Sequence, residues 1–224
     1  MRKGDFLKRY SKNIEIISLN DEMIKNIPTY WVEALSKQTA EARKKRIIEE
    51  WEKYPYQFQS TTNYLSGNLI DIELVKENDN YALLYSINNL AKKEVYYIGY
   101  NPIIKVVPDY FDKLPLSFRD IYNKLHNGWV FFASKSNGLS PIESTIILGD
   151  EDWGILDDID ITHFPFKLDN SIGLFHNGMG DYAAIDTESE NKTIGFIWKH
   201  DDVPSVNVGI WEIIDEWTKI GIER

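Results

Sequence analysis

The stretch IDIELVKENDNYALLYSINNLAKKEVYYIGY, residues 70–100, decides the fold. Apolar and polar side chains alternate over residues 70–74 and again over 81–87. This period of two is typical of a strand with one buried face. The polar residues 77–80 separate these two runs, and another polar turn precedes residues 95–100. The stretch is therefore predicted to form three antiparallel strands joined by hairpins.

Helical patterns lie on both sides of this stretch. Apolar residues recur three and four positions apart between residues 24 and 51, after Pro115, and along residues 210–220. This spacing places them on one face of a helix. Proline favours the beginning of the second helix, and the sequence His126-Asn127-Gly128 is suited to end it. Residues 54–67, which have no such period, are predicted to be turns.

Strands return in the second half of the chain. Short apolar runs predict them at residues 129–133, 144–148, 172–175, 182–185 and 194–198, with a loop at 134–141. Strands grouped between helices indicate an α+β fold, mainly an antiparallel sheet flanked by N-terminal and C-terminal helices. A subdomain seam is expected just after the apolar run 103–107. Residues 1–107 would form a helical segment plus a β-meander. The sequence leaves open whether they belong to the same domain as the α+β unit 108–224.

Composition narrows the class of protein. The chain has 224 residues, of which 43% are hydrophobic, which is enough for one core or for two small ones. It has no cysteine, so disulfides, thiolate metal sites and thiol nucleophiles are excluded, as fits a reducing compartment. No apolar run approaches the roughly 18 residues of a membrane span, and the first residues lack the apolar core of a signal peptide. We expect a cytoplasmic protein that does not contact membranes.

Charge is unevenly distributed. The chain has 25 basic and 35 acidic side chains, a net charge of -10. Residues 1–107 carry 16 basic and 14 acidic side chains, whereas residues 108–224 carry 9 and 21. The second half, with a net charge of -12, should repel phosphate backbones, so nucleic acid is not expected to bind there. The excess favours a basic protein partner or a cation, although acidity also simply keeps proteins dispersed.

The sequence has few recognisable catalytic motifs. It contains no Gly-x-Ser-x-Gly, Walker, dinucleotide-binding or His-Glu-x-x-His motif. His126 and His176 each begin a His-Asn-Gly tripeptide, in which Asn-Gly favours a turn. We expect no enzymatic activity, no cofactor and no metal. A small hydrolase that uses His126, His176 and carboxylates remains the alternative, and it requires both histidines to converge on one cavity.

The most acidic feature is residues 150–160, DEDWGILDDID, in which six of eleven side chains are acidic; we call it the acidic segment. It is not a calcium loop of the EF-hand kind, because Gly154 falls at position 5 and Ile161 at position 12. Carboxylates around an exposed Trp153 would attract a basic partner and surround an aromatic anchor. A weak cation site and a solvated loop remain open alternatives. The predicted partner-binding residues are Asp150, Glu151, Asp152, Trp153, Asp157, Asp158 and Asp160.

The order of several motifs resembles the SUKH superfamily, which includes fungal cell-wall assembly regulators and bacterial immunity proteins. The resemblance covers roughly residues 110–221. Its motifs are Leu114-Pro115-x-x-Phe118, His126-Asn127-Gly128-Trp129, Gly138-x-x-Pro141, the run Gly180-Asp181-Tyr182-Ala183-Ala184-Ile185-Asp186, His200-Asp201, and a last helix with Trp211 and Trp217.

This resemblance implies a non-enzymatic α+β domain that binds other proteins. Its bacterial members typically neutralise a cognate toxin domain, often a nuclease. We therefore expect an immunity protein that inhibits a basic toxin domain stoichiometrically through its acidic surface. A scaffold or regulator, as among the fungal relatives, is the alternative. Residues 1–107 depart from the compact family pattern, and the sequence leaves open whether the protein is a monomer or a homodimer.

Overall fold

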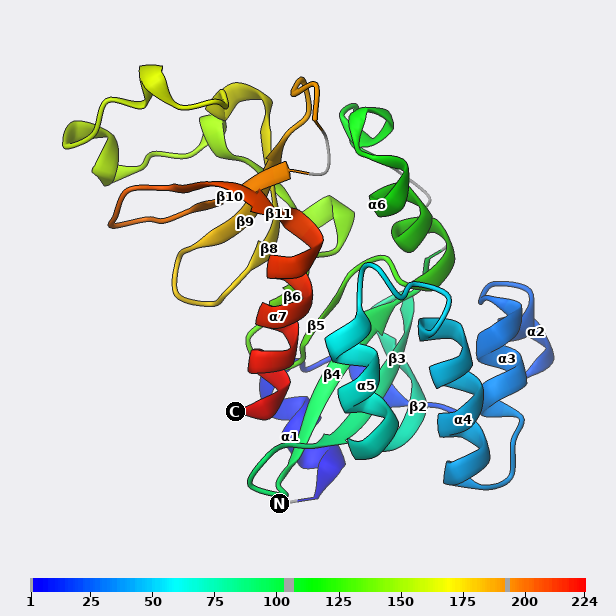
Figure 1. The fold of residues 1–224 in the computed structure, drawn as a ribbon. Coiled ribbons are helices and arrows are strands. Elements are labelled where there is room, and N and C mark those ends of the chain that lie inside the picture. Colours follow the sequence, from blue (N-terminus) through cyan, green and yellow to red (C-terminus); the bar gives the residue numbers. More distant parts are fainter. Residues whose placement is uncertain (1, 103–106, 192–193) are drawn as a thin grey trace.

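An 11-stranded antiparallel sheet runs through this computed structural model, which describes residues 2–102, 107–191 and 194–224 (Figure 1). The helices are α1 (Lys3–Tyr10), α2 (Asp21–Ile24), α3 (Thr29–Leu35), α4 (Ala40–Trp51), α5 (Gln59–Asn68), α6 (Leu116–Asp120) and α7 (Ile210–Glu223). The strands are β1 (Ile14–Ile16), β2 (Leu69–Glu77), β3 (Asn80–Asn88), β4 (Glu94–Tyr100), β5 (Trp129–Phe131), β6 (Ser136–Leu139), β7 (Ile146–Ile147), β8 (Ser171–His176), β9 (Tyr182–Asp186), β10 (Ile194–Trp198) and β11 (Ser205–Gly209). The α+β class is confirmed.

The predicted meander is confirmed as β2, β3 and β4. In the β2–β3 hairpin Glu77 pairs with Asn80, and Asn78 takes the positive φ of 54° that such a tight turn requires. The strands of the sheet follow one another nearly in chain order, from β1 to β6 and then β8 to β11, while β7 pairs with β8. Hairpin-length connections therefore build most of the sheet.

The sheet continues across the predicted seam. Strand β4 pairs with β5, with Ile98 opposite Val130, and a single apolar cluster contains both Trp31 and Ile214. The apolar run at residues 103–106 lies outside the described residues. The first and second halves of the chain thus share one sheet and one large core.

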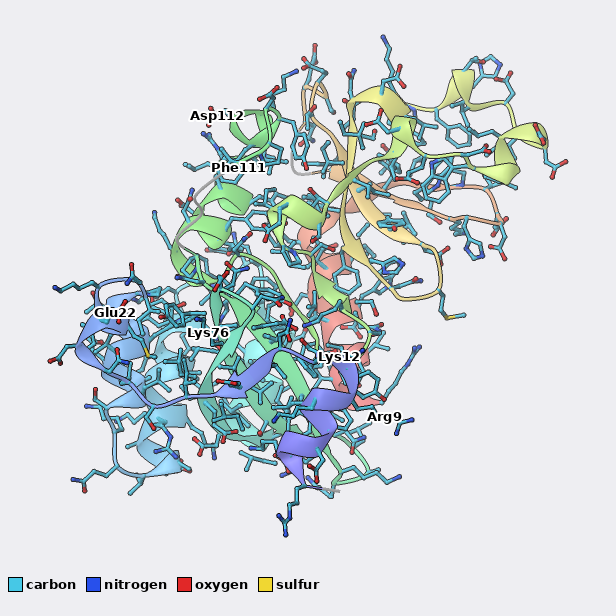
Figure 2. All side chains as sticks on the ribbon, turned by 180° about the vertical axis from the view of Figure 1, so that it is seen from behind. Arg9, Lys12, Glu22, Lys76, Phe111 and Asp112 are labelled. Carbon is cyan, nitrogen blue, oxygen red and sulfur yellow. The ribbon has the colours of Figure 1, made fainter. Side chains whose placement is uncertain are left out.

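The two faces of the sheet are covered differently. Helices α3 to α7 pack against one face and bury the large core there (Figure 1). Along β5, Trp129 belongs to this core, whereas its neighbour Val130 belongs to a cluster under α1 on the other face. Along β9, Ala183 and Ala184 alternate in the same way, and Ala184 lies under residues 148–168. Figure 2 shows this second face, with α1 at one end.

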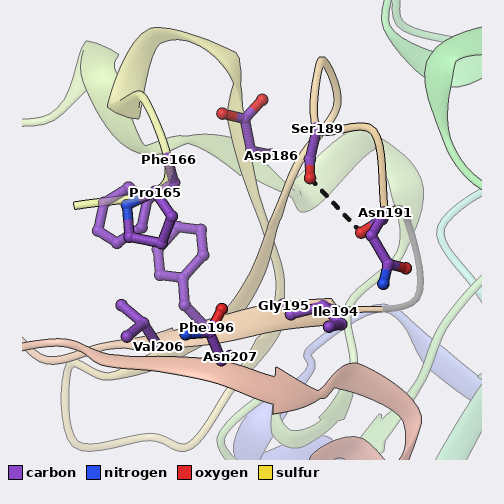
Figure 3. Close-up of a pocket in the computed structure, with 10 residues that line it drawn as sticks. All are labelled: Pro165, Phe166, Asp186, Ser189, Asn191, Ile194, Gly195, Phe196, Val206 and Asn207. Carbon is purple, nitrogen blue, oxygen red and sulfur yellow. Dashed lines mark hydrogen bonds between the residues drawn. The ribbon is translucent and has the colours of Figure 1, made fainter.

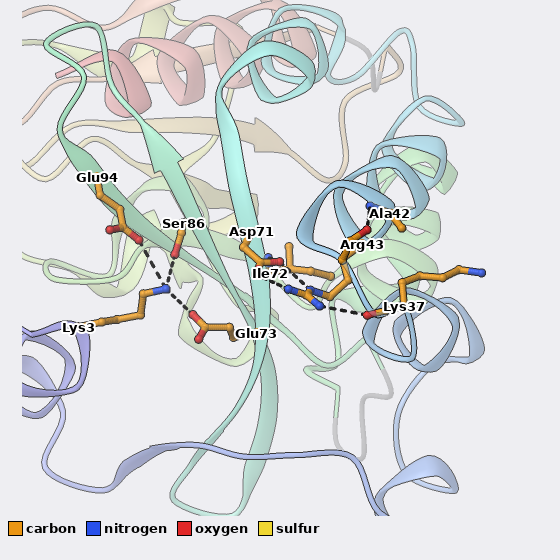
Figure 4. Close-up of polar contacts among 10 residues, drawn as sticks. Lys3, Lys37, Ala42, Arg43, Asp71, Ile72, Glu73, Ser86 and Glu94 are labelled. Carbon is orange, nitrogen blue, oxygen red and sulfur yellow. Dashed lines mark hydrogen bonds and ion pairs between the residues drawn. The ribbon is translucent and has the colours of Figure 1, made fainter.

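Ion pairs fix two of these helices on β2 (Figure 4). Lys3 of α1 donates to Glu73 at 2.5 Å and to Ser86 at 2.9 Å. Arg43 of α4 binds Asp71 through two nitrogens, at 2.7 and 2.5 Å. Bidentate arginine–carboxylate pairs of this kind add geometric specificity to the packing.

The prediction of turns at residues 54–67 is correct up to residue 58 and wrong beyond it, because α5 occupies residues 59–68. This helix, QSTTNYLSGN, has no clear apolar period, and Leu65 is fully buried within it. Its first backbone N–H groups are satisfied from a distance: Asp215 of α7 accepts from Ser60 N at 2.7 Å and from Thr61 N at 2.8 Å. A tertiary cap therefore stabilises a helix that its own sequence does not indicate.

Other elements also differ from the predictions. Residues 134–141, predicted to be a loop, contain β6, and the predicted strand 144–148 shrinks to the two residues of β7. Elements α1, β1 and β11 were not predicted. The helices after Pro115 and at residues 210–220 and the strands β8, β9 and β10 are confirmed. No helix in the described parts of the chain is long and apolar enough to cross a membrane.

Candidate protein-binding surface

The acidic segment lies on the outside of the second face of the sheet. Short 3-10 turns shape it, with Leu148–Asp150 at its start, Gly154–Asp157 within it and Ile161–His163 directly after it. All six predicted carboxylates are exposed, at Asp150, Glu151, Asp152, Asp157, Asp158 and Asp160. The structure thus brings the predicted acidic residues together on one short stretch of surface.

An aromatic base holds this segment in place. Phe166 and Phe196 stack with ring centroids 3.8 Å apart and planes 3° from parallel, and Trp198 is fully buried beside them. Ile155 and Leu156 of the acidic segment pack against this cluster. The apolar side chains of the segment therefore bind the sheet, while its carboxylates remain in solvent.

Trp153 is part of that base, so the prediction that it is exposed is wrong. Its indole N–H donates to the carbonyl oxygen of Leu148 at 2.7 Å, and its ring lies edge-on to Trp198 at 5.4 Å and to Tyr182 at 6.0 Å. The side chain is half-buried. A tryptophan next to buried aromatic rings gains more from packing than from exposure among carboxylates.

The charges of the acidic segment are left free for other molecules. Within the described residues, no ion pair joins its carboxylates to a lysine or arginine. Asp160 alone has local partners: it accepts from Thr162 N at 2.9 Å and Oγ1 at 2.6 Å, and it lies 3.6 Å from His163. The bonds from Thr162 lower the pKa of Asp160. The other five carboxylates have no hydrogen-bond or ion-pair partner among the described residues.

A hollow of about 200 Å³ opens on the same face, between the residues packed under α1 and those under the acidic segment. Val130 and Tyr100 line it on the α1 side, and Tyr182, which touches Trp153, lines it on the other. Lys135, Ser140, Pro141, Ser144 and His176 complete the wall.

Some polar groups that line this hollow already have hydrogen-bond partners, whereas others have none among the described residues. The Lys135 ammonium donates to both oxygens of Glu77, at 2.9 and 3.1 Å, and to the Tyr100 hydroxyl at 2.9 Å. In contrast, the side chains of Ser144, His176 and Tyr182 form no hydrogen bond with any other described residue. Burial lowers the pKa of His176, although Asp181 opposes this, so the ring is neutral near pH 7.

A second, apolar cavity of about 120 Å³ lies beside β10 and β11 (Figure 3). The stacked rings of Phe166 and Phe196 form part of its wall, together with Val206, and Asp186 lies at its edge. Both oxygens of Asp186 already accept backbone N–H groups, from Lys167 and Glu188. The cavity therefore extends the aromatic base, and its one carboxylate is already hydrogen-bonded to the backbone.

The two histidines of the hydrolase alternative do not meet. His126 is 1% exposed, its Nε2 lies 2.7 Å from the Tyr85 hydroxyl, and Trp31 and Trp51 contact its ring on the large-core face. It fits there because a Cβ on Gly99 would lie 2.6 Å from its ring. His176 instead lines the hollow on the opposite face. The two histidines therefore do not line one cavity, as the hydrolase alternative requires.

One group of described residues could offer three ligand atoms to a cation, namely Asp181, His200 and Asp201. However, both ring nitrogens of His200 face carboxylates, at 2.9 Å from Asp181 and 3.6 Å from Asp201. The hydrogen bond with Asp181 raises the pKa of His200. An imidazole that contacts a carboxylate at each ring nitrogen explains the group without a metal.

Sequence analysis did not place Tyr182 or His176 beside the acidic segment. The one local signal is Gly173, because a Cβ there would approach the Tyr182 ring to 2.8 Å. Glycine on β8 thus leaves room for the tyrosine of β9 to lie against the sheet. The pairing of His176 with Tyr182 follows from the hairpin register, which the sequence does not specify.

Comparison with known proteins gives no relative: no family model, curated protein or solved structure matches the chain. What the surface does is therefore inferred from its charge and geometry.

Proposed function

We propose that this chain is a non-catalytic binding protein that neutralises a basic toxin domain by covering it stoichiometrically. The observation that carries the proposal is the acidic segment, whose exposed carboxylates form no ion pair with a lysine or arginine of the described chain. Its aromatic base packs the segment against the sheet and so positions these carboxylates on the surface. Preorganised charge costs less to bind than charge on a mobile loop.

Electrostatics favours a basic partner. Residues 108–224 carry a net charge of -12, and long-range attraction raises the rate at which a basic protein finds such a surface. Nuclease domains need positive surfaces to hold phosphates. An acidic protein bound there competes with nucleic acid for the same lysines and arginines. We therefore propose a nuclease domain as the partner and direct occlusion as the mode of inhibition.

The resemblance to the SUKH superfamily supports the same proposal, because its bacterial members include immunity proteins. The chain has no cysteine and so needs no oxidising compartment, which suits action in the cytoplasm of the cell to be protected. No catalytic residue is required for inhibition by occlusion.

The first experiment is growth rescue. The chain is co-expressed in a bacterial host with the C-terminal toxin-like domain of the large protein encoded beside its gene. Rescue with a co-purifying one-to-one complex is the expected result. A toxic neighbour with neither rescue nor complex would overturn immunity to that neighbour, whereas a complex without rescue would favour a scaffold.

The second experiment tests the surface. Asp150, Asp152, Asp157 and Asp158 are replaced together by Asn, and binding is measured at several salt concentrations. We expect the association rate at low salt to fall by about tenfold or more and its salt dependence to flatten. The charge-matched control replaces four exposed carboxylates of the first half, in the variant D5N/D21N/E22Q/E49Q. Equal behaviour of the two variants would show that net charge, rather than this surface, attracts the partner.

A further inference from the structure

The hollow beside the acidic segment combines a concave shape, hydrogen-bonding groups without a partner among the described residues, and acidic surroundings. Its volume is about 200 Å³, and it lies between Tyr100 and Tyr182. Tyr182 connects it to the acidic segment through the ring of Trp153. A partner that binds the acidic segment therefore passes over this hollow.

Negative charge surrounds the hollow. Glu143 is exposed in the same turn as the lining residues Pro141 and Ser144. Glu151 is exposed in the acidic segment, and its charge, after burial, raises the pKa of Tyr182. The charge of Asp181 likewise raises the pKa of His176, although burial lowers it by more. The one cation in the wall, Lys135, is matched by Glu77 and so cancels none of these charges.

We propose that the hollow receives an arginine side chain from the basic partner. This inference rests on the proposed function and deepens it, because it identifies the residue type that the surface recognises. The hydroxyls of Ser144 and Tyr182 and the imidazole of His176 would accept from the guanidinium N–H groups, and Pro141 would contact the alkyl stem.

Arginine fits better than lysine for a geometric reason. The rings of His176 and Tyr182 lie 4.9 Å apart and are tilted by 33°, so together they offer flat aromatic surface in the wall of the hollow. A planar guanidinium can stack on such rings while its edge donates several hydrogen bonds. A compact ammonium can use only one of these two kinds of contact at a time. Arginine in a desolvated pocket is also a typical centre of binding energy at protein interfaces.

A small probe tests the inference without the partner. Acetyl-arginine methylamide is titrated into the isotope-labelled full chain, and shifts of backbone and side-chain NMR signals are recorded. The comparison probe is the citrulline analogue, which has nearly the same shape but no charge. We expect saturable shifts at Ser140, Ser144, His176 and Tyr182, with affinity roughly tenfold lower for citrulline. Equal binding of the two probes, no binding, or shifts confined to residues 150–160 would each overturn the inference.

Variants locate the binding. S144W places a large side chain at an exposed position on the rim and should abolish the shifts by filling the hollow, whereas S36W, at an exposed serine after α3, should leave them unchanged. Y182F removes one acceptor and keeps the ring, so it should weaken arginine binding by a few fold. Shifts that survive S144W in a folded protein would contradict the assignment to the hollow.

The same variants separate this inference from the proposed function. If the fourfold Asn variant loses the toxin domain while S144W binds it normally, the acidic surface is the interface and the arginine pocket is wrong. If arginine binds the hollow but neither rescue nor complex forms with the neighbouring toxin domain, the pocket stands and immunity to that neighbour fails.

Discussion

Two aromatic regions of this molecule, one around His126 and one under the acidic segment, differ in what surrounds their polar groups. Around His126, Trp51 donates to the Tyr85 hydroxyl and Tyr85 meets the imidazole, so the polar atoms of these buried side chains satisfy one another. Under the acidic segment Phe166 and Phe196 stack closely, but the carboxylates above them have no lysine or arginine partner in the described chain. The first arrangement stabilises the fold, whereas the second holds charge ready for another molecule.

The largest expected effect on stability comes from comparing the loss of one tryptophan in each region. Trp51 is fully buried between Phe58, Tyr85 and Trp129, so Trp51→Ala should lower the free energy of unfolding by about 3–5 kcal/mol. Trp153 is half-buried, so Trp153→Ala should cost only about 1–2 kcal/mol. Urea unfolding followed by circular dichroism measures both. Similar losses would mean that the aromatic base of the acidic segment is as important for stability as the core.

The next effect is the pH dependence of stability that comes from His126. Burial lowers the pKa of His126 to about 3, while a histidine in the unfolded chain titrates near 6.5. The unfolded state therefore binds more protons below about pH 6.5, and stability should decrease as pH falls toward 3. From this site alone the loss should reach about 2 kcal/mol at pH 5.

His200 should behave in the opposite way. Its pKa is raised through Asp181, so its contribution to stability is fully present below the unfolded pKa and is lost as pH rises through the folded one. NMR titration of the histidine ring signals would show both shifts. Comparing the pH dependence of unfolding in H126Q with that in H163Q, a change at an exposed histidine, isolates the buried site. A His126 signal that titrates near 6.5 in the folded protein would contradict its burial.

The difference between the regions also explains what sequence analysis found and missed. Alternation in residues 70–100 predicted β2 to β4, because each strand has one face toward the large core. Helix α5 was missed because its cap comes from Asp215, more than 150 positions away. The exposed carboxylates were predicted correctly from composition, but Trp153 was placed wrongly, because its packing partner Trp198 lies on a distant strand. The hollow depends on hairpin register, which no local pattern encodes.

Replacing a buried or an exposed aspartate by alanine should have a smaller effect on stability. Asp215 is 8% exposed and accepts two backbone N–H groups at the start of α5. Asp215→Ala should lower the free energy of unfolding by about 1–2 kcal/mol, because those donors lose their acceptor. The same substitution at the exposed Asp150 should change it by less than about 0.5 kcal/mol. Hydrogen exchange of α5 in Asp215→Ala should quicken more than that of α4, and uniform protection of both helices would show that the cap does not hold α5.

The smallest expected change in stability belongs to the substitution with the largest expected effect on binding. The fourfold Asn variant of Asp150, Asp152, Asp157 and Asp158 removes no ion pair with a lysine or arginine of the described chain, so folding should lose nothing from it. Removing four like charges from one segment relieves repulsion, which should raise the free energy of unfolding by a few tenths of a kcal/mol at low salt and by less at high salt. Urea unfolding at two salt concentrations measures this, with D5N/D21N/E22Q/E49Q as the control. A loss of stability above about 1 kcal/mol would mean that the carboxylates hold the segment together, and weaker partner binding by that variant would then report a disturbed fold rather than a lost contact.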